Sequence, residues 1–157
     1  MRRFAILLAL TANFALADGI VKEWAVARLK GSSPIEVAEG FFSLAYVENR
    51  GCAWGMFQGN VWPLAVFGAV ALAFLVWKRR QIFGDGKLSI LFSGMLYAGI
   101  LGNMLDRIVR GFVVDMFDFH WGASHFPCFN LADAYITLAA AYLAAGSFFG
   151  SGKDTRK

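Results

Sequence analysis

The chain has 157 residues, of which 58% are hydrophobic and only 17% are charged. Soluble domains are typically about half apolar and about a quarter charged, and one soluble core of this size could not bury so much apolar surface. The net charge is +4, but the basic residues cluster at the ends of apolar stretches and form no polar face, which argues against a nucleic-acid partner. The composition therefore predicts a single membrane domain, residues 1–157, whose solvent is the lipid bilayer.

Four apolar stretches have the length that a helix needs to cross the hydrocarbon. They predict spans over about residues 4–21, 61–77, 88–105 and 131–149, separated on the outer side by segments 22–60 and 106–130. In the third span a small residue recurs every four positions, at Gly94, Ala98 and Gly102, which favours close packing of another helix there.

The basic residues indicate the orientation of the spans, because cytoplasmic loops collect Lys and Arg. With the N-terminus inside, the inner segments hold nine of the fifteen basic residues and only Asp85 and Asp154 of the eleven acids. We therefore expect both termini in the cytoplasm. The first residues also fit a secretory signal with a small-residue cleavage site at residues 15–17. Cleavage there would remove most of the helix that carries Asp18 and Lys22, so we interpret this segment as the first span.

The two outer segments differ in pattern. After the turn signal at residues 32–34, residues 35–47 are rich in aromatic and β-branched side chains and predict short strands. Residues 106–128 are expected to form a loop at the interface that is partly extended, and the tail 151–157 to be disordered. The predicted fold class is an all-α membrane protein, with four transmembrane helices and a small extracytoplasmic β-sheet.

Ionisable groups inside or at the rim of a membrane are costly and usually mark function. Asp18 and Lys22 lie four residues apart near the outer end of the first span, where they form either part of a site, a helix ion pair, or a lysine that snorkels to the interface. Asn49 and Gly51 precede the second span, and their spacing is also typical of a turn.

A third polar group, Asn103, Asp106 and Arg107, ends the third span. A neutral Asp106–Arg107 pair is the alternative to substrate contact for these residues. The fourth group joins Asp115, in the outer loop, to Asn130 and Asp133 at the start of the fourth span. Asn130 can cap this helix with Asp133 in its first turn, but capping does not explain Asp115 at the same depth.

Elimination leaves the two aspartates as the reactive groups. None of the serines lies in a nucleophile-elbow sequence, and His120 and His125 lack the HExxH pattern, so we expect no metal. Cys52 and Cys128 either form a disulfide or are separate buried thiols. Two close aspartates share a proton, so one can act as base and the other as acid, without a cofactor.

Two other classes of protein fit part of the pattern. A small transporter would relay ions through Asp18, Asp106 and Asp133, but it would need polar groups through the whole bilayer depth, and the inner halves of the spans carry almost none. A structural partner of the secretion apparatus would tolerate replacement of the aspartates without a processing defect.

Five blocks of residues, in order along the chain, resemble the lipoprotein signal peptidase family, the type II signal peptidases of bacteria. They are Asp18-x-x-x-Lys22; Asn49-x-Gly51-x-Ala53-Trp54; Gly102-Asn103-x-x-Asp106-Arg107; Val113-Val114-Asp115; and Phe129-Asn130-x-Ala132-Asp133. The chain departs from the family pattern at Gly19, where Gln is usual, and at Cys52, where a small residue such as Ala is usual.

The resemblance implies an aspartyl peptidase of the bacterial inner membrane, with Asp115 and Asp133 as the catalytic pair at the outer face. Its substrate would be a prolipoprotein that carries diacylglycerol on a cysteine and is cut just before that cysteine. The cyclic peptide globomycin would inhibit it, and we expect a monomer. The supporting or substrate-binding residues would be Asp18, Lys22, Asn49, Gly51, Asn103, Asp106, Arg107, Asn130 and Ala132.

Overall fold

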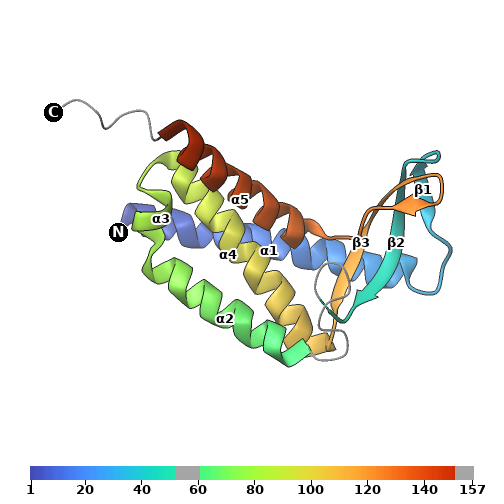
Figure 1. Cartoon of the computed structure of the whole chain (residues 1–157). Coiled ribbons are helices and arrows are strands. Elements are labelled where there is room, and N and C mark those ends of the chain that lie inside the picture. The colour runs from blue at the N-terminus through green and yellow to red at the C-terminus, as the bar shows by residue number, and fades with distance from the viewer. Residues whose placement is uncertain (52–60, 151–157) are drawn as a thin grey trace.

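The structure is a computed structural model that describes residues 1–51 and 61–150. Its helices lie side by side, and a small sheet stands at an angle to them at the end away from the N-terminus (Figure 1). In chain order the elements are α1 (Arg2–Leu29), β1 (Ile35–Ala38), β2 (Phe42–Asn49), α2 (Val61–Trp77), α3 (Arg79–Phe83), α4 (Lys87–Arg110), β3 (Val113–Trp121), β4 (Ser124–His125) and α5 (Leu131–Gly150). The predictions for Ala53, Trp54 and the tail 151–157 fall outside the described residues.

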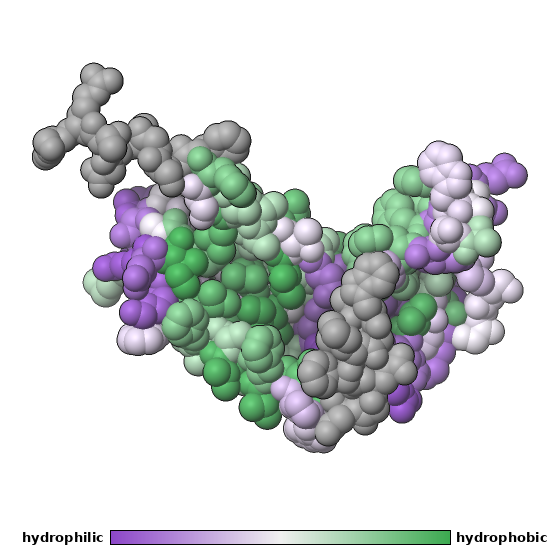
Figure 2. Space-filling view, viewed as in Figure 1, coloured by the Kyte–Doolittle hydropathy of each residue, from purple (hydrophilic) through white to green (hydrophobic). Residues whose placement is uncertain are grey.

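Three of the described helices are long and apolar enough to cross a membrane, namely α1, α4 and residues Leu131–Phe148 of α5. The second predicted span corresponds to α2, whose 17 residues extend about 26 Å at ~1.5 Å per residue, less than the ~30 Å hydrocarbon. Apolar surface covers the helical part, and polar surface gathers toward its two ends (Figure 2). The protein is thus mostly helical with apolar spans, as predicted, while the number of spans stays a prediction.

Two helices continue farther toward the sheet than the apolar stretches predicted. α1 reaches Leu29, beyond the predicted end near residue 21, and α4 continues past residue 105 to Arg110. Hydropathy marks where the lipid ends, whereas the helices continue because side chains of their next turns are also buried, namely Ala25 and Leu29 in α1 and Asp106 in α4. Ala25 and Leu29 pack in one cluster with Val114 and Met116 of the sheet. The left-handed Gly111, with φ of 76°, ends α4 by donating its N–H to the Arg107 carbonyl.

The sheet is antiparallel with the order β1-β2-β3-β4, so β3 is an inner strand. The prediction that residues 106–128 are partly extended is therefore confirmed, but the prediction of a loop is wrong for Val113–Trp121, which form a strand. The first four residues of β3 are all buried, so they lack the alternating pattern of a half-exposed strand. In the register of β2 with β3, Val47 pairs with Asp115 and Asn49 with Val113. This pairing brings the end of β2 next to Asp115.

α4 is the central helix, because α1, α2 and α5 all pack on it. Its glycines permit this approach, as the small-residue pattern predicted. A Cβ on Gly102 would lie 2.5 Å from Asp18 Oδ2, and one on Gly94 would lie 3.2 Å from Leu10 Cβ. Gly99, outside the predicted stripe, faces α5, where its Cβ would lie 2.5 Å from the Ala132 carbonyl oxygen.

Gly99→Ala should lower the free energy of unfolding by about 1–3 kcal/mol, the usual cost of overpacking. The added methyl meets backbone that cannot rotate away, so α5 must shift. Thermal unfolding of the detergent-purified protein measures the loss. Gly19→Ala in α1 is the matched control, because open space surrounds that position and alanine favours helix. Equal melting temperatures of the two variants would contradict the close packing of α4 on α5.

Candidate active site

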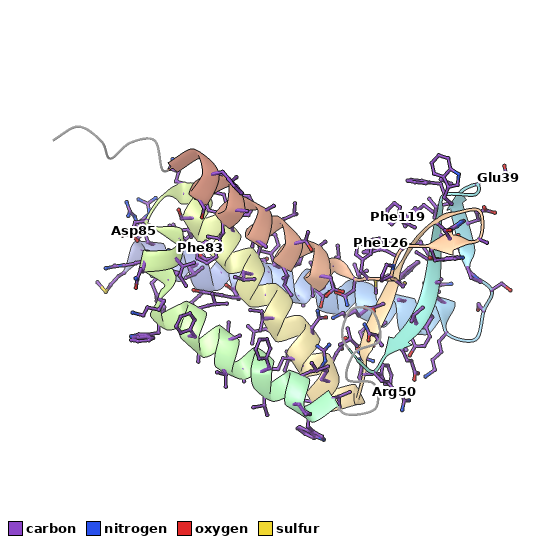
Figure 3. The ribbon with its side chains drawn as sticks, in the orientation of Figure 1. Glu39, Arg50, Phe83, Asp85, Phe119 and Phe126 are labelled. Carbon is purple, nitrogen blue, oxygen red and sulfur yellow. The ribbon has the colours of Figure 1, made fainter. Side chains whose placement is uncertain are left out.

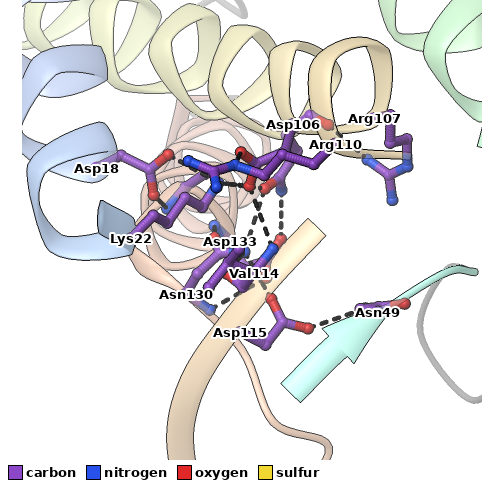
Figure 4. A network of polar contacts seen from close by, with 12 residues as sticks. Asp18, Lys22, Asn49, Asp106, Arg107, Arg110, Val114, Asp115, Asn130 and Asp133 are labelled. Carbon is purple, nitrogen blue, oxygen red and sulfur yellow. Dashed lines mark hydrogen bonds and ion pairs between the residues drawn. The ribbon is translucent and has the colours of Figure 1, made fainter. Parts of the chain in front are cut away.

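The polar groups named from the sequence converge where α1, α4 and α5 meet the sheet (Figure 4). Asp18, Lys22, Asp115 and Asn130 are buried there, although they come from two separate elements, α1 and β3, and from the segment before α5. Since buried charges are tolerated only when they are paired and hydrogen-bonded, the partners of each group show how the site is assembled.

Lys22 is the cation at the centre of the site. Its Nζ lies 2.8 Å from Asp18 Oδ2 and 3.0 Å from Asp106 Oδ2, and it donates a 3.0 Å hydrogen bond to Asn103 Oδ1. The side chain is 2% exposed, so the alternative of a lysine that snorkels to the interface is wrong. The lysine binds α1 to α4 and offsets the charges of two buried carboxylates.

Asp18 also reaches α5. Its Oδ1 accepts a 2.9 Å hydrogen bond from the backbone N–H of Ala132, in the first turn of that helix. The first N–H groups of a helix have no partner inside it, and here a side chain from a different helix satisfies one of them. Asp18 therefore fixes the position at which α5 begins.

Asp106 holds the start of β3. Its Oδ2 accepts a hydrogen bond from Val114 N at 3.2 Å, and its Oδ1 pairs with Arg110 Nε at 3.0 Å. The alternative of an Asp106–Arg107 pair is not among the described contacts, where Asp106 pairs with Arg110 and Lys22, because residues four apart share a helix face and adjacent residues do not. Arg110 was missed, although its spacing from Asp106 carried the signal. It also pairs with Glu23 of α1.

Arg107 points instead toward the chain between β2 and α2. Its guanidinium donates to the carbonyl oxygens of Asn103 and Gly51, both at 3.1 Å. Gly51 also donates its N–H to Asn49 Oδ1 at 3.0 Å, so the turn expected at Asn49 is present. Arg107 and this turn together fix the end of β2.

Asn130 and Asp133 form a reciprocal cap at the start of α5, as the sequence predicted. Asp133 N donates to Asn130 Oδ1 at 3.0 Å, and Asn130 N donates to Asp133 Oδ2 at 3.3 Å, the arrangement of a capping box. The other carboxylate oxygen of Asp133 accepts a 2.7 Å hydrogen bond from Asn103 Nδ2. The Asp133 carboxylate is thus held from both α4 and the helix start.

Asp115 shares Asn130 with Asp133. The Asn130 amide nitrogen donates to Asp115 Oδ1 at 2.7 Å, and Asn49 Nδ2 donates to Asp115 Oδ2 at 2.9 Å. The segment before α5 runs along β3, where Phe117 and Phe129 exchange backbone hydrogen bonds. This pairing is what carries Asp133 to Asp115.

Burial and the charge of Asp133 raise the pKa of Asp115 to about 7. The amide donors of Asn49 and Asn130 act in the opposite direction, because they stabilise the ionised carboxylate. Near neutral pH, Asp115 can therefore hold a proton while a carboxylate stands close to it. This is the charge state that an acid–base pair requires.

Among the described residues, a cavity of about 1760 Å³ lies between α2, α4 and α5. Asp133 lines its polar end together with Asn49, Gly51, Asn103 and Arg107. The rest of the lining is mostly apolar, with Leu64 and Phe67 of α2, Leu96 and Ile100 of α4, and Leu138 of α5. Phe126 also lines it and lies beside the sheet in Figure 3. The polar groups thus meet one end of a long apolar hollow.

Residues 1–51 and 61–150 contain no group of three or more His, Cys, Asp or Glu side chains that could hold a metal ion. His120 and His125 pair across β3 and β4, where His120 contacts Ser43 and His125 contacts Asp118. The alternative of a Cys52–Cys128 disulfide cannot be followed, since Cys52 lies outside the described residues.

A family model described as signal peptidase (SPase) II matches residues 10–149. The chain belongs to the signal peptidase II family. It is 36% identical over 147 residues to the lipoprotein signal peptidase of Shewanella sp. (strain MR-4), an alignment that covers 90% of this chain and 85% of the relative. The lipoprotein signal peptidase of Symbiobacterium thermophilum is 37% identical over 139 residues, covering 88% and 90%.

Two solved structures, each described as a bacterial membrane enzyme determined by the in meso method, have the same fold. The one at 2.3 Å resolution has a TM-score of 0.82 and 25% identity, covering 96% of this chain and 92% of its own. The one at 1.9 Å resolution has a TM-score of 0.74 and 27% identity, covering 95% and 94%. As a signal peptidase II, the chain is a bacterial membrane protein and a hydrolase, which confirms the family resemblance of the five blocks.

Proposed function

We propose that Asp115 and Asp133 are the catalytic pair of an aspartyl endopeptidase that removes the signal peptide from diacylglyceryl-modified prolipoproteins. Cleavage falls just before the lipidated cysteine. The observation that carries this proposal is that Asn130 donates to both carboxylates, one of which, Asp133, lines the polar end of an apolar cavity. The carboxylates that can cleave a peptide bond thus adjoin an apolar surface that can bind lipid.

The pair carries one proton, and the raised pKa of Asp115 favours its location there. The ionised Asp133 removes a proton from a water molecule as that water attacks the scissile carbonyl carbon. The protonated Asp115 gives its proton to the carbonyl oxygen, so the tetrahedral intermediate is a gem-diol and Asp115 is ionised. When the C–N bond breaks, Asp133 gives the proton it took from water to the amine nitrogen, and a hydroxyl of the gem-diol returns its proton to Asp115, so the site returns to its starting charge.

The remaining polar residues have positioning roles in this mechanism. Asn49, Asn103 and Asn130 orient the two carboxylates by donating to them. Asp18, Lys22 and Asp106 join α1 to α4. Asp106 also accepts from Val114 of β3, and Asp18 accepts from the backbone N–H of Ala132 in α5. Gly51 and Arg107 line the cavity and support substrate there.

The apolar part of the cavity suits the acyl chains and the signal helix of a lipidated substrate. Its walls come from α2 and α5, which both pack on α4. A substrate in the membrane can therefore enter sideways, between α2 and α5. An enzyme with this arrangement draws its affinity from lipid contacts and applies its polar groups only at the scissile bond.

The proposed topology has four spans, with both termini in the cytoplasm of a bacterial inner membrane and the site at the outer face. α2 is the shortest span, and its 17 residues fall at the lower end of the usual range of roughly 17–25. Exposed Trp62 and Trp77 at its two ends favour this assignment, since tryptophan is enriched at membrane interfaces. We propose that the enzyme acts as a monomer.

Incubation of the purified protein with a diacylated prolipoprotein tests the proposal. We expect release of the signal peptide, with the new N-terminus at the lipidated cysteine, and inhibition by globomycin. The same precursor without diacylglycerol should be cut far more slowly. Failure to cut the lipidated precursor, or equal cleavage of both precursors, would overturn the proposed substrate.

The alkaline limb of the pH profile should lie near pH 7. Below that pH the pair retains its single proton, and above it Asp115 ionises, so kcat/KM should fall towards tenfold per pH unit. Asn49→Ala removes a donor that stabilises the ionised Asp115, so it should move the limb to higher pH. The measurement is kcat/KM from pH 5 to 9 for both proteins. An alkaline limb in the same position for both would contradict this role of Asn49.

A further inference from the structure

The end of the helical part opposite the sheet holds a second, smaller pocket. It has a volume of about 480 Å³ and lies between α3 and the last turns of α5. Ile82, Phe83 and Leu143 form its apolar walls, and Arg80, Gln81 and Ser147 are polar groups on its lining. A pocket with both kinds of wall matches the part of a phospholipid where the acyl chains join the headgroup.

Three guanidinium groups converge around Asp85, and one of them, that of Arg80, lines this pocket. An Arg79 nitrogen lies 2.7 Å from Asp85 Oδ1, the Arg80 Nε lies 3.6 Å from the same oxygen, and Arg3 donates to the Asp85 carbonyl oxygen at 3.2 Å. Asp85 and Phe83 are labelled at this end in Figure 3. One carboxylate cannot neutralise three cations, so positive charge remains beside the pocket.

The excess of positive charge extends over the whole of this end of the helices. The described residues here include a single acid, Asp85, and six basic residues, namely Arg2, Arg3, Lys78, Arg79, Arg80 and Lys87. Retention of positive loops inside the cell accounts for the number of cations. It does not account for the convergence of cations from α1 and α3 on Asp85, or for Arg80, which lines the pocket and is 83% exposed.

We propose that this pocket binds the headgroup of an anionic phospholipid. The phosphate lies against Arg3 and Arg80, whose planar guanidinium groups match phosphate oxygens, and the glycerol end lies against Ile82 and Leu143. Basic pockets between membrane helices are typical sites for such headgroups. The leaflet follows from the topology proposed above, which places this end at the cytoplasmic side. The pocket lies at the opposite end of the helices from Asp115 and Asp133, so its occupancy is separate from catalysis.

Native mass spectrometry of the detergent-purified protein tests the site with phosphatidylglycerol as the probe and phosphatidylcholine for comparison. We expect wild-type protein to retain phosphatidylglycerol in preference to phosphatidylcholine. Arg3→Gln combined with Arg80→Gln should reduce the fraction bound at least fivefold. Arg28→Gln combined with Lys30→Gln is the matched control, since it removes the same charge from exposed positions at the outer end of α1, and it should retain the lipid.

Three outcomes would overturn the proposal. The first is equal binding of phosphatidylglycerol and phosphatidylcholine. The second is an equal loss of bound phosphatidylglycerol in the two double variants. The third is a rise in melting temperature with glycerol 1-phosphate as large as the rise with phosphatidylglycerol, which would indicate a site for free phosphate. Arg79 is left unchanged because it also bonds the Gly84 carbonyl and supports the loop. Cleavage of the lipidated precursor in neutral detergent should be unchanged by Arg3→Gln and Arg80→Gln, so this result and that of the proposed peptidase activity are independent.

Discussion

Asp115→Asn and Asp133→Asn should each reduce cleavage of a diacylated prolipoprotein by about a thousandfold or more, the scale of losing an acid–base group. An amide can neither take a proton from water nor give one to the leaving amine. The size of asparagine and its hydrogen-bonding edge allow the fold to persist, so the loss should appear in kcat. The measurement is single-turnover cleavage with purified protein, accompanied by a melting temperature for each variant.

Asp118→Asn is the matched control for these two variants. Asp118 lies on the same strand as Asp115, but its carboxylate contacts His125 at the outer hairpin. We expect near wild-type cleavage from it. Wild-type rates in either site variant would exclude the proposed pair, and a comparable loss in Asp118→Asn would show that the assay reports disturbance of β3 instead of the chemistry.

Lys22→Met should lower the free energy of unfolding by about 3–5 kcal/mol, the usual cost of removing one partner of a buried ion pair. The change leaves Asp18 and Asp106 buried without their shared cation, and Asn103 loses the donor that orients its amide. Methionine preserves most of the volume, so the effect is electrostatic. Chemical or thermal unfolding in detergent measures it.

Lys30→Met provides the comparison for Lys22→Met. Lys30 is 55% exposed and lies 3.4 Å from Glu48, and such surface pairs contribute about 0–1 kcal/mol. Adding Asp18→Asn to Lys22→Met should recover part of the stability, because it removes one of the two stranded charges. Equal stabilities of Lys22→Met and Lys30→Met would show that the buried network does not hold α1 to α4.

The network also explains why the family's residues are spread along the chain. Asp115 lies on the strand β3 and Asp133 on the helix α5, so the two aspartates share neither a sheet nor a helix bundle. Asp106 fixes Val114 on one side, and Asp18 fixes Ala132 on the other. Lys22 contacts both of these carboxylates, so a single ammonium group links the two supports of the catalytic pair.

The local features of the site could be predicted from the sequence because they depend on short spacings. The Asn130–Asp133 cap, the Asn49 turn and the Asp18–Lys22 pair each lie within four residues. The alternative of an Asp106–Arg107 pair treated adjacency in sequence as contact, whereas the helix places Arg110 beside Asp106. The burial of Lys22 could not be predicted, since both a snorkelling and a buried lysine fit the same pattern.

The sequence by itself determined that this protein is embedded in a membrane and which stretches are apolar. It also determined which polar residues have so high a free-energy cost in the membrane that they indicate function. Hydropathy and helical spacing are local properties, so they are readable without a fold. Only the tertiary structure decided that Val113–Trp121 is an inner strand and that Asn130 touches both aspartates. Those facts depend on pairings between segments far apart in the chain, such as Asp18 with Ala132, and no local pattern encodes them.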